Sequence, residues 1–179
     1  GTDLTFDVGD RPVPVSPGAV SRPGDLDWFP GAMANVAPVE KSIQGTIAVD
    51  GSLFPFGLAD ELVLLHLEDG VIRDITGDSL AMQFKSWVAS LKDKVAYHLC
   101  HVSVGFNPRA KMTGAIMEDE RLLGAITIGF GRQPGDLGGT IEGGEHHLDV
   151  ILRPPTIVAG DKTLLENEAF NADLGFVAL

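Results

Sequence analysis

Two histidines and an aspartate stand close together late in the chain, in the stretch "EGGEHHLDVIL". The apolar residues that follow them predict a β-strand, and alternate residues of a strand share one face. His147 and Asp149 therefore point the same way, while Leu148 and Val150 point into apolar packing. His146 belongs to the opposite face or to the preceding loop. The spacing predicts that His147 and Asp149 can converge on one metal ion, and that His146 does not join them.

A second segment, "YHLCH", offers the third ligand. Its β-branched and aromatic surroundings predict a strand, which places His98 and His101 on opposite faces, so at most one of them reaches the site. Two imidazoles and a carboxylate leave three coordination positions open, the arrangement of non-haem Fe(II) oxygenases. His-x-Asp also arises by chance, so spacing alone leaves two alternatives open, a metal site and satisfied surface histidines.

Three further side chains near these motifs are candidates for chemistry. Tyr97, the only tyrosine, would share a strand face with His101 and act as a phenolic acid or as a packing residue. Glu145 would orient a liganding histidine, or be a solvated loop carboxylate. Cys100 is expected to point away from His101 and to lack an activator, which argues against a catalytic thiol.

The elements that position these residues can be read from local patterns. Asp69-Gly70 between two apolar runs predicts a β-hairpin. Residues 79–91 have helical spacing, with Asp78 or Ser79 as the cap and a core-facing apolar stripe. Further strands are expected over 95–104 and 124–131. The sum predicts an α+β fold, a mixed and largely antiparallel sheet with one main amphipathic helix and long loops.

Several segments read as loops. Proline-rich residues 10–35 predict an extended surface loop, part of which, with Trp28, Phe29 and Met33, is expected to pack down or line a cleft. Residues 129–144 hold seven glycines, but their spacing is not that of a nucleotide-binding loop. The pattern favours a mobile loop that covers a functional site. The acidic cluster at residues 118–120 is expected to be a helix start or a solvated face.

Composition excludes several classes of function. A chain of 179 residues with 44% hydrophobic residues suits one globular domain over residues 1–179. The net charge of −12 argues against a nucleic-acid partner and against an anionic membrane surface. No apolar run is long enough for a membrane span. A single cysteine excludes an internal disulfide and favours a reducing cytoplasm. The absence of a starting Met suggests a processed product or a piece of a longer protein.

Several longer motifs occur in an order that resembles one superfamily: "GTDLTF", "APVEKSIQGTIAVDGSL", "LEDGVI", "HVSVGFNPRA", "EDERLLGAITIGFG" and "HLDV". It joins the 2,5-dihydroxypyridine 5,6-dioxygenases to the metallo-aminopeptidases of the aminopeptidase T type. The resemblance spans almost all of this chain and matches the C-terminal half of those proteins. It implies that this chain is the C-terminal part of a two-domain protein, that an N-terminal domain is missing, and that the protein forms a homo-oligomer.

The two branches imply different chemistry. The dioxygenases hold one Fe(II) by two histidines and an aspartate, and the resemblance places these roles on His101, His147 and Asp149. The aminopeptidases hold two metals with additional ligands, including a glutamate pair before the "AP" motif, where this chain has Ala32 and Met33. The resemblance thus favours a single-ion site.

Three hypotheses follow for the function. The first is an Fe(II)-dependent ring-cleaving dioxygenase-like domain that acts on a hydroxylated pyridine or a related aromatic, with O₂ as the second substrate. The second is an aminopeptidase or amidohydrolase in which Zn²⁺, Co²⁺ or Mn²⁺ activates water. The third is a non-catalytic binding domain derived from the same family, which would hold no metal.

Overall fold

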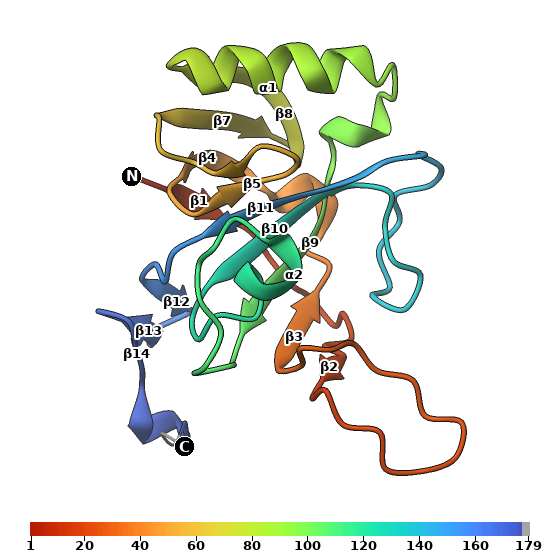
Figure 1. Cartoon of the computed structure of the whole chain (residues 1–179), viewed down its shortest axis with the longest axis vertical. Coiled ribbons are helices and arrows are strands. Elements are labelled where there is room, and N and C mark those ends of the chain that lie inside the picture. The colour runs from red at the N-terminus through yellow and green to blue at the C-terminus, as the bar shows by residue number, and fades with distance from the viewer. Residues whose placement is uncertain (177–179) are drawn as a thin grey trace.

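In the computed structural model, residues 1–176 are described, and they form three antiparallel sheets (Figure 1). The four-stranded sheet has the order β1 (Asp3–Thr5), β4 (Gln44–Val49), β7 (Val63–Glu68) and β8 (Val71–Gly77). The seven-stranded sheet has the order β2 (Val15–Ser16), β3 (Met33–Val36), β9 (Leu99–Gly105), β10 (Ile126–Gly131), β11 (His147–Leu152), β5 (Ser52–Leu53) and β6 (Gly57–Leu58). The small third sheet comprises β12 (Ile157–Ala159), β13 (Lys162–Glu166) and β14 (Ala169–Phe170).

The helices are few. They are α1 (Ser79–Ser90), the short α2 (Ile116–Asp119) and the 3₁₀ turns η1 (Glu40–Ser42), η2 (Val95–Tyr97) and η3 (Ala172–Leu174). The expected α+β fold with one main helix is therefore confirmed. Within the described range, no helix combines the length and the apolar character that a membrane crossing requires.

The predicted hairpin and helix both form where expected. β7 and β8 pair around Asp69 and Gly70, which both adopt positive φ as a tight hairpin turn requires. Asp78 is the N-cap residue of α1, but its carboxylate accepts the N–H of Leu62, and Glu61 accepts the N–H of Leu80 instead. A residue distant along the chain thus satisfies a helix-start donor that the local sequence assigns to Asp78 or Ser79.

The main core lies between the two larger sheets and α1. Phe84 on α1, Leu65 on β7 and Phe130 on β10 are completely buried members of one apolar cluster. Each such side chain stabilises the fold by roughly 1.5–3 kcal/mol relative to its exposed state. The alternation on β10 and β11 sends Ile128, Phe130 and Leu148 into this core, so the intervening residues face the opposite side of the seven-stranded sheet.

Two expectations about loops are confirmed in part. Met33 packs down and Phe29 lines a pocket beside Asn107, but 62% of the surface of Trp28 is exposed on the loop that projects from β2 and β3 (Figure 1). The acidic cluster is a helix start, with Glu118 and Asp119 in the first turn of α2, and not a solvated face, because Asp119 and Glu120 are buried. Asp119 accepts hydrogen bonds from Ser52 and from the backbone N–H groups of residues 113 and 114, so it fastens this loop to β5.

The glycine-rich connection between β10 and β11 is tied to the rest of the chain at several points. Glu40 accepts the N–H of Thr140 and forms an ion pair with Arg11. Gln133 donates to the carbonyl of Cys100 and accepts the N–H of Ile141. These bonds hold the loop beside the start of β9.

Candidate metal centre

The face of the seven-stranded sheet that points away from the core carries a row of functional groups. In the register of β9, β10 and β11, Gly129 lies directly between His101 and Asp149. Neighbouring strands are about 4.8 Å apart, so the backbones of the two outer residues are separated by roughly twice that distance. Their side chains meet only by leaning over the glycine. A Cβ at Gly129 would lie within 2.8 Å of three atoms of the His101 imidazole, so the absence of a side chain there makes the arrangement possible.

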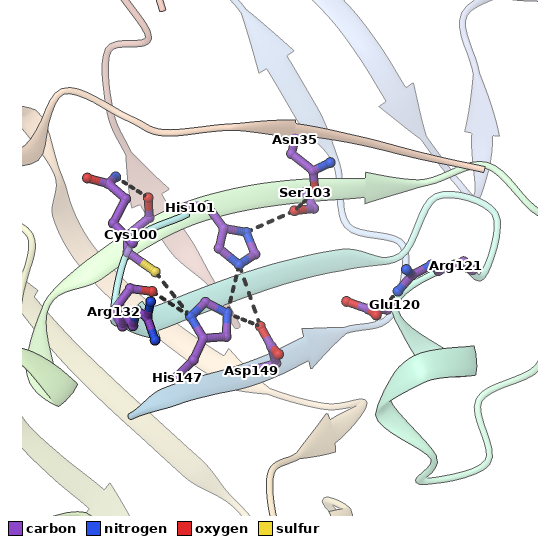
Figure 2. Close-up of polar contacts among 10 residues, drawn as sticks. Asn35, Cys100, His101, Ser103, Glu120, Arg121, Arg132, His147 and Asp149 are labelled. Atoms are coloured by element: carbon purple, nitrogen blue, oxygen red, sulfur yellow. Dashed lines mark hydrogen bonds and ion pairs between the residues drawn. The ribbon is translucent and has the colours of Figure 1, made fainter. Parts of the chain in front are cut away.

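Figure 2 shows that the side chains of His101, His147 and Asp149 point toward one another. His101 Nε2 lies 3.1 Å from His147 Nε2 and 3.6 Å from Asp149 Oδ1, and His147 Nε2 lies 3.3 Å from the same carboxylate oxygen. The two imidazole rings stack with centroids 5.1 Å apart and planes at 7°. The structure therefore brings together all three residues that the resemblance implies as metal ligands.

The far side of each imidazole is fixed by a hydrogen bond. His101 Nδ1 lies 2.9 Å from Ser103 Oγ, which donates its own proton to Asn35 Oδ1 at 2.7 Å. Because the Ser103 proton is committed to Asn35, Ser103 accepts, and His101 Nδ1 carries the hydrogen. His147 Nδ1 lies 2.8 Å from the carbonyl oxygen of Arg132, so it must donate as well. Both Nδ1 atoms are donors, so the Nε2 atoms face the convergence point and are the nitrogens that offer lone pairs to a metal when the rings are neutral.

The convergence point therefore needs a positive charge. Asp149 Oδ1 is buried, and among the described residues it makes no contact with the geometry of a hydrogen bond. Two lone pairs and an unpartnered carboxylate oxygen repel one another unless a proton or a cation lies between them. Imidazoles and carboxylates are common metal ligands, and in metal sites the imidazole nitrogen that does not bind the metal is usually hydrogen-bonded to the protein. The residues fit a bound divalent ion.

Electrostatics differ between the two histidines. Burial lowers the pKa of His101 to about 4, opposed in part by the charge of Asp149, so this imidazole is neutral near pH 7. Burial also lowers the pKa of His147, but the neighbouring Asp149 carboxylate and the contact with Cys100 outweigh it and raise that pKa to about 11, so without a metal a proton on His147 supplies the positive charge at neutral pH. His147 is the exposed member, with 33% of its side chain accessible against 7% for His101 and 19% for Asp149. The centre is thus open to solvent on the His147 side.

Cys100 lies at the same place, contrary to the expectation that it points away. Leu99 pairs with Phe130 and His101 pairs with Gly129, so Cys100 is an extra residue in an irregular part of β9. Such a bulge breaks the alternation of faces. The Cys100 sulfur lies 3.8 Å from His147 Nδ1, and burial raises the pKa of the thiol. Ligand atoms of Cys100, His101 and His147 all lie within 4.8 Å of one another, which makes this trio a second candidate ligand set.

The other candidate residues lie apart from the convergence point. Tyr97 is not on the strand, because the chain forms the turn η2 before β9 begins, and the side chain packs against the core. The Glu145 side chain is exposed, and its backbone N–H donates to Asp93. His146 Nδ1 also contacts Asp93, at 3.2 Å, as expected for a residue outside the metal site. The catalytic roles of Tyr97 and Glu145 stay predictions, and no contact among the described residues supports them.

Sequence reasoning missed the residues that support the ligands. Ser103 follows His101 by two positions and so shares its strand face, a signal that was present in the sequence. Asn35 comes from β3, which pairs with β9 at Ser103, and Gly129 comes from β10. Neither has a local signal, because only the register of the sheet brings them to the centre.

Removing the hydroxyl of Ser103 tests the orientation of His101. In Ser103→Ala the imidazole loses the acceptor that fixes its tautomer. We expect metal affinity to fall by about 10- to 100-fold, as is usual when a residue that hydrogen-bonds a metal ligand is removed. Titration calorimetry with Co²⁺ or anaerobic Fe²⁺ measures the change. Thr127→Val is the matched control, because Thr127 pairs with Ser103 across the sheet and its buried hydroxyl makes no hydrogen bond among the described residues. Equal affinities for the two variants would contradict the orienting role.

Comparison with known proteins gives a consistent result. A family model for 2,5-dihydroxypyridine 5,6-dioxygenase matches residues 1–167. A curated relative, the 2,5-dihydroxypyridine 5,6-dioxygenase of Pseudomonas putida KT2440, is 27% identical over 181 aligned residues, which cover 92% of this chain and 50% of the relative. The chain thus spans about half the length of the curated relative it matches.

Two solved structures share the fold. The 2,5-dihydroxypyridine dioxygenase from Pseudomonas putida KT2440 superposes with a TM-score of 0.81 at 24% identity, over 96% of this chain and 55% of that one. AmpT from Thermus thermophilus superposes with a TM-score of 0.63 at 18% identity, over 87% of this chain and 42% of that one. Because the family model matches far more than half of the sequence, the chain belongs to the 2,5-dihydroxypyridine 5,6-dioxygenase family.

Proposed function

We propose that this chain is the metal-bearing part of a non-haem Fe(II)-dependent dioxygenase that cleaves the ring of a hydroxylated pyridine or a related aromatic. The observation that carries the proposal is the convergence of two imidazole Nε2 atoms, each with its Nδ1 held by another group, on a buried carboxylate oxygen without a hydrogen-bond partner among the described residues. Membership of the family supports the reaction class. The matched region covers 50% of the curated relative, so the proposal concerns the part of the enzyme that this chain represents.

His101, His147 and Asp149 are the proposed ligands, rather than the trio that includes Cys100. The thiol lies on the Nδ1 side of His147, and that nitrogen already donates to the carbonyl of Arg132. A cysteine ligand would require this bond to break and the buried thiol to lose its proton. Asp149 needs neither change, and a carboxylate with two imidazoles suits Fe(II) better than a thiolate does.

Each residue has a defined part in this proposal. Bound Fe(II) would supply the Lewis-acid and redox chemistry that the hydroxylated ring and O₂ require. His101 and Asp149 hold the buried side of the centre, and Ser103 and Asn35 keep His101 in the tautomer that binds. His147 holds the open side, so the ring is expected to approach past it. The residues would hold the two reactants in a fixed relative orientation.

The reaction is tested by oxygen consumption. We expect the chain to bind one Fe²⁺ under anaerobic conditions and then to consume O₂ with 2,5-dihydroxypyridine at a rate proportional to bound iron. An oxygen electrode measures the uptake, and loss of the substrate absorbance measures ring cleavage. Identical uptake by the iron-loaded and iron-free protein would overturn the dioxygenase proposal, and two ions per chain would favour a hydrolase instead.

The ligand set is tested separately with Co²⁺, whose absorption reports its donors. We expect the Co²⁺-loaded chain to show visible d–d bands without the near-ultraviolet charge-transfer band of a thiolate ligand. Cys100→Ala should leave both the spectrum and the affinity unchanged within about twofold, because Cys100 lies outside the proposed coordination sphere. A charge-transfer band that disappears in Cys100→Ala would assign the centre to the cysteine-containing trio.

A further inference from the structure

A single carboxylate, that of Asp93, lies where both ligand-bearing strands begin. Asp93 follows α1, and its Oδ1 accepts the N–H of Val95 at 2.9 Å. Its Oδ2 accepts the N–H of Glu145 at 2.8 Å, the N–H of His146 at 3.2 Å and a contact from His146 Nδ1 at 3.2 Å. Only 10% of the Asp93 side chain is exposed. One residue therefore receives donors from two segments that are about fifty positions apart in the chain.

These two segments lead directly to the proposed ligands. Val95 begins the turn η2, after which β9 carries His101. Glu145 and His146 immediately precede His147, the first residue of β11. Because β9 and β11 are both antiparallel to β10, they run in the same direction, and their first residues lie at the same end of the sheet. Asp93 thus joins the turn that leads into β9, of which it is itself a neighbour, to the residues that lead into β11.

The start of β11 needs such an attachment. The connection from β10 is rich in glycine, so its local backbone preferences alone impose little orientation on the strand that follows, and contacts with other segments must set it. Two backbone hydrogen bonds lie at the same end of the sheet. Gly131 donates its N–H to the carbonyl of His98, and Arg132 donates its N–H to the carbonyl of His146. They tie each strand to β10, whereas Asp93 ties to each other the segments that precede the two outer strands. The same hydrogen bonds, led by that from Glu145, lower the pKa of Asp93 to about 2, so the carboxylate is charged at neutral pH.

We propose that Asp93 is a positioning residue for the metal centre, which fixes the start of β11 relative to β9 and so sets the separation of His147 from His101. The inference rests on the proposed metal centre, which Asp93 itself does not touch. Small displacements matter, because a site with three protein ligands tolerates little change in their separation. Asp93 therefore acts on metal binding through the backbone that carries His147.

The test compares Asp93→Ala and Asp93→Asn with the unaltered chain. We expect Asp93→Ala to weaken Co²⁺ and Fe²⁺ binding by about tenfold and to change the d–d spectrum of bound Co²⁺, because the geometry of the ligands is altered. Asp93→Asn keeps one acceptor oxygen and should recover part of the affinity. Calorimetry is done well below the unfolding temperature of each variant, so that the loss of affinity is separated from any loss of stability.

Asp25→Ala is the matched control. Asp25 also accepts two backbone N–H groups and a side-chain donor, but in the projecting loop, from Ser21 and Arg22. The Asp25→Ala variant should bind metal with the affinity of the unaltered chain. If the unaltered chain binds no metal, the proposed function fails. If it binds metal and both Asp93 variants keep its affinity and Co²⁺ spectrum, the positioning role alone is overturned. Should Asp93→Ala not fold, the same comparison with Asp93→Asn decides the matter.

Discussion

Gly129→Ala should abolish tight metal binding by the chain and leave its fold intact. The added methyl group would occupy the space over β10 through which the His101 imidazole reaches His147 and Asp149. The ring is the end of a side chain and can swing away, so overpacking should destabilise the fold by only about 1–3 kcal/mol. Metal binding loses one of three ligands. Zinc sites with four ligands bind with roughly 10–16 kcal/mol, or about 3 kcal/mol per ligand. Affinity should therefore fall on the order of 100-fold.

Calorimetric titration with Co²⁺ measures this loss, and circular dichroism with thermal unfolding monitors the fold. Gly135→Ala is the matched control, because it lies in the same glycine-rich region and a Cβ there would meet no atom within 4 Å. A Gly129→Ala protein that binds metal as tightly as Gly135→Ala would show that His101 does not need to cross over β10, and would remove it from the ligand set.

His147→Ala should lose both metal binding and oxygen consumption. His147 is the ligand on the open side of the centre and is a third exposed, so its removal is expected to change the free energy of unfolding by only about 1 kcal/mol. Loss of its Nε2 should lower Fe²⁺ affinity on the order of 100-fold. Uptake of O₂ with 2,5-dihydroxypyridine should then fall to the rate of the iron-free protein.

His98→Ala is the control for this substitution. His98 ends the turn before β9, and sequence spacing alone did not decide whether His98 or His101 reaches the centre. The His98 variant should keep the metal affinity and the oxygen uptake of the unaltered chain. The proposal would not survive a His147→Ala protein whose uptake matched that of His98→Ala.

Much of the fold could be predicted because its signals are local. Asp69-Gly70 predicted the hairpin of β7 and β8, and the apolar spacing of residues 80–91 predicted α1. The placement of His147 and Asp149 on one face followed from the two-residue period of a strand, which the hydrophobic pattern of β11 fixes. These properties depend on neighbours within a few residues.

Other features had no local signal. The bulge in β9 turned Cys100 toward His147, although strict alternation predicted the opposite direction. Tyr97 was expected on the strand, but β9 begins only at Leu99. Bulges and strand starts depend on which groups of the neighbouring strand are available for pairing, and a single segment does not contain that information.

The sequence by itself determined the secondary structure of the ligand-bearing segments, the shared face of His147 and Asp149 and, through family resemblance, the identity of the third ligand candidate. Only the tertiary structure decided that His101 reaches them over Gly129, that Ser103 and Asn35 set its tautomer, and that Asp93 joins the segments that precede the two strands. The physical reason is that these arrangements arise from the register between β9, β10 and β11, which is set by pairing across the whole sheet.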